Sequence, residues 1–214
     1  MKIMHVDTSP KGDWSNSRAL SRYFLDKLAE TIPGLEIDYL DLDIETPAHV
    51  TKDFAIATYA QERDRTPEMK AVLAESDALC ARLLAADACV FAMPMYNWSM
   101  PSRFKAYIDA ITRPGITYKV VDGGIVGQLS RQKVLFITTR GADLRPGGDY
   151  DGMDGLTPAL RAAFRFIGAD SPRFVDAQPL QFSDREARTA ALIRAKAELD
   201  EVARGWSSDL ALAA

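Results

Sequence analysis

Short apolar runs of strand length alternate along this chain with longer segments of helical periodicity. Residues 2–7 form an apolar, β-branched run, and the segment that follows places its apolar positions on one helical face, at Leu20, Phe24, Leu28 and Ile32. Further strands are predicted at residues 35–40, 88–93, 133–138 and 173–177. Helices are predicted between them at residues 66–85, 101–111 and 156–167.

The last helix has a start signal of its own. Ser183 and Glu186 have the spacing of a capping box, and the apolar positions behind them recur at helical spacing, at Leu192, Ala195, Leu199 and Val202. We expect one domain over residues 1–204 and a loosely held tail over residues 205–214.

Five strands that alternate with helices predict an α/β fold, in which a parallel sheet is covered by helices on both faces. The strand count favours a flavodoxin-like three-layer sandwich with strand order 2-1-3-4-5, and the first loop lacks the glycines of the dinucleotide-binding alternative. Two segments lie outside the alternation. Residues 41–65 form a long connection that we expect to be partly helical and to build a pocket or a subunit contact. Residues 116–132 contain Asp122-Gly123-Gly124, which predicts a hairpin.

Charge and composition argue against several classes of partner. The net charge of −4 disfavours nucleic acid and anionic membranes, because both bind concentrated positive charge. The sequence shows no charged-then-apolar leader and no apolar run near the roughly 20 residues that cross a bilayer, so we expect a cytoplasmic protein. Cys80 and Cys89 fit neither a disulfide framework nor a metal-ligand spacing, and we expect both to be buried, reduced thiols.

The most specific loop follows the third predicted strand. Residues 94–98 read Pro-Met-Tyr-Asn-Trp. Loops at the carboxyl ends of strands are where open α/β sheets bind ligands. Two aromatic rings and one amide suit a flat heterocycle with a polar edge. We interpret this loop as a flavin-binding segment.

The first loop, residues 8–17, places several hydroxyl groups and one amide at a helix N-terminus. Free N–H groups and the helix dipole favour an anion there. The loop lacks the glycine patterns that bind nucleoside triphosphates or dinucleotides, so a monophosphate fits better. The alternative is that Ser15 or Ser17 only caps the helix.

A third loop, residues 138–143, follows the fourth predicted strand. Gly141 permits close approach of the backbone to a ligand, and N–H groups of such a turn could donate to the carbonyl side of a flavin ring, although the turn is common in itself. The aspartates at 149, 151 and 154 do not have calcium-loop spacing. Residues 143–155 are therefore predicted to form a solvated flap without a metal site.

Three motifs give the chain a family resemblance: Pro94-Met95-Tyr96-Asn97-Trp98-x-x-Pro101, Lys105-x-Tyr107-x-Asp109 and Arg113-x-Gly115-x-Thr117-Tyr118. The chain resembles the FMN-dependent NADH-azoreductases of the flavodoxin-like NAD(P)H-quinone oxidoreductase superfamily. The resemblance implies FMN-binding roles for three sets of residues. The phosphate set is Ser9, Ser15, Asn16 and Ser17; the flavin-ring set is Met95, Tyr96, Asn97 and Trp98; the pyrimidine-edge set is Thr139, Arg140, Gly141 and Ala142. Ala142 replaces a frequent glycine, which matters if that position needs a positive φ.

The resemblance also implies a reaction. The enzyme would be a homodimer with active sites at the subunit interface, using NADH or NADPH as hydride donor and FMN as bound carrier. It would reduce quinones and cleave azo compounds by two-electron, ping-pong transfer. Because the flavin carries the chemistry, no catalytic side chain and no metal are expected. The alternative from another class is a flavodoxin-type carrier of single electrons between proteins.

Overall fold

A five-stranded parallel sheet lies at the centre of the computed structural model, which describes residues 1–213 and the side chains of residues 1–209. Its strand order is β2-β1-β3-β6-β7. These strands are β1 (Lys2–Asp7), β2 (Glu36–Asp41), β3 (Ala88–Pro94), β6 (Lys133–Thr139) and β7 (Arg173–Ala177). Because β4 and β5 belong to a separate two-stranded hairpin, this order is the predicted 2-1-3-4-5, and the flavodoxin-like arrangement is confirmed.

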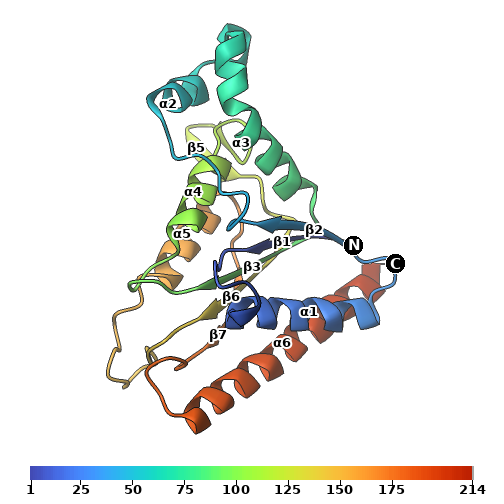
Figure 1. Ribbon diagram of the computed structural model, residues 1–214. Coiled ribbons are helices and arrows are strands. Elements are labelled where there is room, and N and C mark those ends of the chain that lie inside the picture. Colours follow the sequence, from blue (N-terminus) through green and yellow to red (C-terminus); the bar gives the residue numbers. More distant parts are fainter. Residues whose placement is uncertain (214) are drawn as a thin grey trace.

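Helices cover both faces of the sheet (Figure 1). One face carries α1 (Asn16–Thr31) and α6 (Arg185–Ala213), and the other carries α3 (Pro67–Ala85), α4 (Ser102–Ile111) and α5 (Thr157–Phe166). The chain's two ends lie near each other, at the edge opposite the loops that follow the strands (Figure 1). Within the described residues, no helix is both long and apolar enough to span a membrane.

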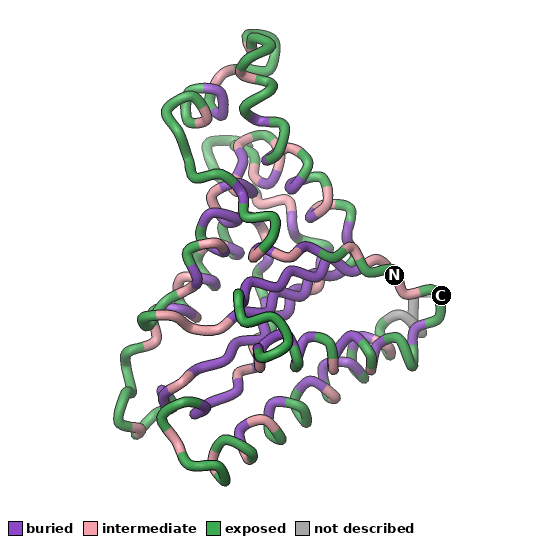
Figure 2. The backbone as a smooth tube through the Cα atoms, viewed as in Figure 1, coloured by how far each residue is buried: buried purple, intermediate pink, exposed green. Residues whose placement is uncertain are grey.

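The central strands are buried on both faces, as Figure 2 shows by their purple colour. Alternate residues of β3 therefore face different helices: Phe91 packs toward α4 and α5, whereas Val90 packs toward α1 and α6. The ring of Phe91 lies 4.9 Å from that of Phe164 and 5.3 Å from that of Phe136, measured between centroids. The large aromatic side chains thus fill one layer of the core.

Both segments outside the alternation have the predicted character. The long connection contains α2 (Lys52–Tyr59) and a short 3-10 turn, η2 (Glu62–Asp64), so it is partly helical. The hairpin consists of β4 (Tyr118–Val121) and β5 (Gly124–Gly127). Asp122 and Gly123 at its tip have φ of 50° and 77°, as the tight turn of a hairpin requires.

Two expectations about the last helix are wrong. The cap is Asp184, whose Oδ1 accepts the Ala187 N–H at 2.7 Å, whereas the Ser183 hydroxyl donates to the Pro179 carbonyl at 3.3 Å. The boundary at residue 204 is also misplaced, because α6 continues without interruption to Ala213. Trp206 is buried and packs edge-on against Phe24 of α1, with 5.3 Å between the ring centroids. The first residues after position 204 therefore belong to a packed helix and not to a loose tail.

Both thiols are free and fully buried, as predicted. Burial raises the pKa of Cys80 and of Cys89 to about 12, so both remain protonated at neutral pH.

A close backbone contact holds the hairpin to the sheet. A Cβ placed on Gly127 would lie 2.1 Å from the Gly168 nitrogen at the end of α5. We expect Gly127→Ala to lower the free energy of unfolding by about 1–3 kcal/mol, the usual cost of overpacking, measured by urea denaturation. The matched control is Gly205→Ala in α6, where the added methyl group meets open space. It should be neutral or stabilising, by up to about 1 kcal/mol. Equal stability of Gly127→Ala and wild type would show that this contact is not tight.

Candidate functional site

A cleft of about 550 Å³ lies where the first, third and fourth strand-to-helix loops of the sheet meet. Six of the predicted site residues line it: Asn16, Met95, Tyr96, Thr139, Arg140 and Gly141. The loops are tied together by the backbone, since the Met95 N–H donates to the Thr139 carbonyl at 2.8 Å and the Arg140 N–H donates to the Ala177 carbonyl at 3.0 Å. Residues far apart in sequence thus form one continuous wall.

The three predicted serines lie behind the surface of the first loop. Ser9, Ser15 and Ser17 are all buried, and none of them lines the cleft directly. Ser15 caps α1: its Oγ accepts the Arg18 N–H at 3.4 Å and lies 3.0 Å from Ser17 Oγ. Ser15 therefore caps α1, and its predicted role toward a phosphate is a separate expectation. The hydroxyl pair uses only one of its two protons, so the other stays free to donate to an anion.

The N-terminus of α1 keeps free donors. Within the described part of the chain, the N–H groups of Asn16 and Ser17 donate to no acceptor. These are among the first N–H groups of a 16-residue helix, which have no intrahelical partner. Asn16 is also the residue through which this helix end reaches the cleft. The geometry suits an anionic group at this end of the cleft.

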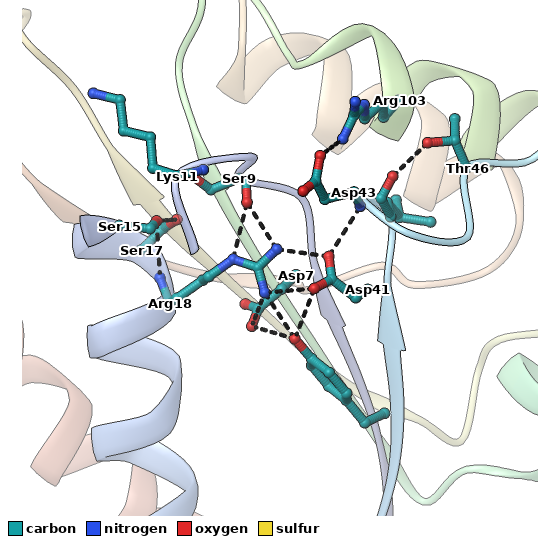
Figure 3. Close-up of polar contacts among 12 residues, drawn as sticks. Asp7, Ser9, Lys11, Ser15, Ser17, Arg18, Asp41, Asp43, Thr46 and Arg103 are labelled. Atoms are coloured by element: carbon teal, nitrogen blue, oxygen red, sulfur yellow. Dashed lines mark hydrogen bonds and ion pairs between the residues drawn. The ribbon is translucent and has the colours of Figure 1, made fainter. Parts of the chain in front are cut away.

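One buried side chain fixes the first loop in place. Arg18 makes five hydrogen bonds, one for each N–H of its guanidinium (Figure 3). Two go to the Ser9 carbonyl at 2.9 and 2.7 Å, and two go to the carboxylate of Asp41 at 2.7 and 2.6 Å. The fifth goes to the Tyr39 hydroxyl at 2.9 Å. The hydrogen bond to Asp41 is the main reason that the pKa of Arg18 is raised despite its burial.

A second carboxylate completes this cluster. Asp7, the last residue of β1, is buried and accepts hydrogen bonds from Ser21 and Tyr39, both at 3.1 Å. Its carboxylate lies 3.6 Å from Arg18 and 3.3 Å from the Nε2 of His5. Burial and the charge of Asp7 raise the pKa of Tyr39 to about 12, so its hydroxyl stays protonated and can donate. His5 therefore lies in a structural cluster behind the first loop.

The loop after β3 is a tight turn with unusual backbone angles. Tyr96 and Ser99 exchange two backbone hydrogen bonds of 3.0 Å each, and Asn97 and Trp98 between them have φ of 47° and 66°. Positive φ costs an L-residue roughly 1–2 kcal/mol and is rarest for bulky side chains. Asn97 and Trp98 are exposed on the turn beside the cleft. Within the described residues, the N–H groups of both donate to no acceptor.

The predicted flap packs against this turn. The Gly155 N–H donates to the Trp98 carbonyl at 3.0 Å, and the rings of Trp98 and Tyr150 lie 5.2 Å apart. Burial acts to raise the pKa of Asp154, but hydrogen bonds from Thr157 and the charge of Arg140 outweigh it, and that pKa is lowered. Within the part of the chain that the structure describes, no cluster of three or more His, Cys, Asp or Glu side chains could hold a metal ion.

The loop after β6 differs from expectation in one respect. A Cβ on Gly141 would lie 3.1 Å from that of Gln181 and 3.4 Å from the Phe182 ring, so a larger residue here would crowd the neighbouring loop. Ala142 is buried and does not have a positive φ, so alanine is not strained there. Arg140 pairs with Asp154 at 3.1 Å and Asp176 at 3.3 Å.

Sequence reasoning missed part of the cleft wall. The lining residues that it missed in the first loop and in the segment after β7 are Lys11, Trp14, Leu180, Gln181, Ser183, Asp184, Arg185 and Arg188. The signal was present: β7 is also a parallel strand, so the segment after it reaches the same sheet edge as the other loops.

The Arg18 cluster predicts a large effect on stability. Arg18→Met should lower the free energy of unfolding by about 3–5 kcal/mol, because it leaves the buried Asp7 and the partly buried Asp41 without their cation. Arg22→Met is the matched control one turn along α1, where an exposed 3.6 Å pair with Asp13 contributes less than about 1 kcal/mol. Chemical denaturation measures both. Similar losses in the two variants would contradict a central role for Arg18.

Comparison with known proteins agrees with this geometry. Residues 1–202 match a family model described by its flavodoxin-like fold. FMN-dependent NADH:quinone oxidoreductase 2 of Trichormus variabilis is 40% identical over 205 residues, which cover 95% of this chain and 99% of that protein. FMN-dependent NADH:quinone oxidoreductase of Nostoc sp. shows the same identity and coverage.

Solved structures give the same picture. An FMN-dependent NADH-azoreductase from Bacillus anthracis strain Ames Ancestor, crystallised in complex with FMN, has a TM-score of 0.85 and 25% identity, covering 97% of this chain and all of that one. The azoreductase of Bacillus anthracis strain Sterne, 24% identical, shares the fold with a TM-score of 0.86 over 95% of this chain and 98% of that one. The predicted resemblance is confirmed, and the chain belongs to the family of FMN-dependent NADH:quinone oxidoreductases.

Proposed function

We propose that the protein is an FMN-dependent NADH:quinone oxidoreductase that also cleaves azo bonds, with donor and acceptor entering the cleft in turn. The observation that carries this proposal is the pairing of two features in one cleft: free donors at the N-terminus of α1 and an aromatic turn, Tyr96 to Trp98, beside the sheet edge. FMN has a group that suits each feature: its phosphate suits the free donors, and its flat ring suits the aromatic turn. The family's name adds the donor and the acceptor class.

The phosphate would be held by the first loop. Asn16 and Ser17 offer free N–H groups, and the Ser15–Ser17 pair offers one free hydroxyl proton. The Oγ1 of Thr8, on the same loop, is buried and has no hydrogen-bond partner within the described residues. Several donors and the positive end of a helix dipole suit a dianion without any metal.

The ring would be held by the other two loops. Free N–H groups at Asn97 and Trp98 can donate to its polar edge, and Tyr96 supplies an aromatic surface. The Nε of Arg140 is buried and lacks a partner within the described residues, although the rest of its guanidinium is paired. Bound FMN supplies the two-electron hydride chemistry, while these residues orient the ring and exclude water.

A homodimer forms part of the proposal. An apolar groove of about 630 Å³ lies outside the sheet, lined by side chains of α2, α4 and α5 that include Phe54, Tyr59, Ile108 and Phe166. The neighbouring hairpin exposes Val120, Val121, Ile125 and Val126. A contiguous exposed apolar surface of this kind is typical of a protein interface. The proposed occupant is a second copy of the chain.

Anaerobic reduction tests the function. Addition of stoichiometric NADH to the FMN-loaded protein should bleach the visible flavin spectrum rapidly, without a semiquinone, and later addition of a quinone or an azo dye should restore it. Retained colour with NADH, together with a stable semiquinone under a one-electron reductant, would instead identify a flavodoxin-type electron carrier.

Sedimentation velocity tests the dimer. The wild-type chain should sediment with the mass of two chains, and Tyr59→Glu should shift it toward the monomer because a charge enters the apolar groove. Tyr59 is 77% exposed in the single chain, so the substitution should not disturb folding. Ile193→Glu, on the exposed surface of α6, is the control and should remain dimeric. A wild-type monomer at micromolar concentration would contradict this part of the proposal.

A further inference from the structure

We infer that Arg185 and Arg188 form an anion-binding wall of the cleft, to which Lys11 contributes. This wall selects flat reactants that carry a negatively charged group. The inference rests on the proposed function and names the chemistry of the ligand that reacts there. A sulfonate or carboxylate on the acceptor and the diphosphate of a nicotinamide dinucleotide share this chemistry.

The two arginines reach the cleft from the same helix. Arg185 is the first residue of α6, and Arg188 follows three positions later, so the two side chains lie on one helical face. Both line the cleft, as does Lys11 from the opposite loop. Within the residues that the structure describes, none of the three forms an ion pair. Their charges are therefore available to a ligand.

The start of α6 is held firmly against the cleft. The Gly141 carbonyl accepts backbone N–H groups from Leu180, Gln181 and Phe182 at 3.1, 3.0 and 2.9 Å. This contact joins the segment before α6 to the loop that carries the four residues predicted at the pyrimidine edge of the flavin. The segment that leads into α6, which carries Arg185 and Arg188, is thus anchored beside the cleft.

The charge balance of the cleft is opposite to that of the chain. The chain has a net charge of −4, yet the cleft is lined by Lys11, Arg140, Arg185 and Arg188 against a single carboxylate, Asp184. Arg140 is already paired with Asp154 and Asp176, and the Asp184 carboxylate accepts the Ala187 N–H. A cleft with uncompensated positive charge raises the local concentration of anions.

An exposed aromatic ring lies in the same cleft. Trp14 is 90% exposed and belongs to η1 (Gly12–Trp14), the 3-10 turn directly after Lys11. Large aromatic rings in ligand clefts commonly stack on flat ligands. The flavin phosphate is assigned to the free donors of α1, so the arginines of α6 remain for a second ligand. Together these features favour a flat molecule with an anionic substituent.

The test compares two acceptors that differ in one charge, 1,4-naphthoquinone and 1,4-naphthoquinone-2-sulfonate. Arg185→Gln/Arg188→Gln is compared with wild type and with a control of equal charge change, Arg131→Gln/Arg204→Gln, whose side chains are exposed and lie outside the cleft. Binding to the oxidised, FMN-loaded protein is followed by perturbation of the flavin spectrum, which needs no turnover. NAD⁺ is titrated in the same way. Steady-state kcat/KM with NADH is then measured for each acceptor.

The cleft variant should bind the sulfonate about five- to tenfold more weakly than wild type, the effect of two partly exposed charges, with unchanged affinity for the neutral quinone. Added salt should reduce the preference of the wild-type protein for the sulfonate over the neutral quinone. If the cleft variant also binds NAD⁺ more weakly, the arginines contact the dinucleotide as well. If only the affinity for NAD⁺ falls, the dinucleotide is the anionic reactant. Unchanged affinity for both anions, or an equal loss for the neutral quinone, would overturn the inference. Failure of the wild-type protein to oxidise NADH with either acceptor would contradict the proposed function, while the binding titrations still decide the role of the arginines.

Discussion

The site depends on one buried cation. Arg18 has a partner for each of its five N–H donors, and those partners come from the first loop and from the end of β2, with Asp7 of β1 close by. A buried guanidinium is stable only when its charge and all its donors are satisfied, so these segments can occupy few other relative positions. The consequence is local to the site: the Ser9 carbonyl turns inward to Arg18, while the N–H groups of Asn16 and Ser17 stay free at the N-terminus of α1, which reaches the cleft through Asn16.

A second constraint acts at the turn after β3. Asn97 and Trp98 both have positive φ, a conformation that asparagine adopts more readily than most residues and that a bulky tryptophan rarely adopts. The turn is held by the paired backbone of Tyr96 and Ser99 and by the Gly155 N–H of the flap. Backbone strain of this kind clusters at functional sites, because the surrounding structure maintains it for a purpose other than stability. Here it leaves two free N–H groups beside the cleft.

The sequence predicts the sheet well because its three central strands are short apolar runs. The strand order is predicted from the count of five strands and from the first loop, which lacks the glycines of the dinucleotide-binding alternative. The sequence predicts three of the four loops that meet at the cleft, since each follows a predicted strand and the family resemblance extends to all three. It does not reveal Arg18, because a charged residue in the first turn of an amphipathic helix is usually solvated, and only the return of β2 brings Asp41 beside it. The same limit applies to Trp206, which is buried by Phe24 from the other end of the chain. The sequence predicts Ser183 as the cap of α6, whereas the cap is Asp184. Both residue types can cap a helix, so only the tertiary structure decides between them.

We propose that the loop held by Arg18 is a phosphate site at one end of a flavin cleft. The most direct measurement is the affinity of the apoprotein for FMN and for riboflavin, which differ only in the phosphate, with Arg18→Met measured alongside. If two charge-assisted hydrogen bonds of about 1.5 kcal/mol each hold the phosphate, the wild-type protein binds FMN about a hundredfold more tightly, and Arg18→Met loses most of that preference. Equal affinity of the wild-type protein for FMN and riboflavin would show that this loop does not bind the phosphate.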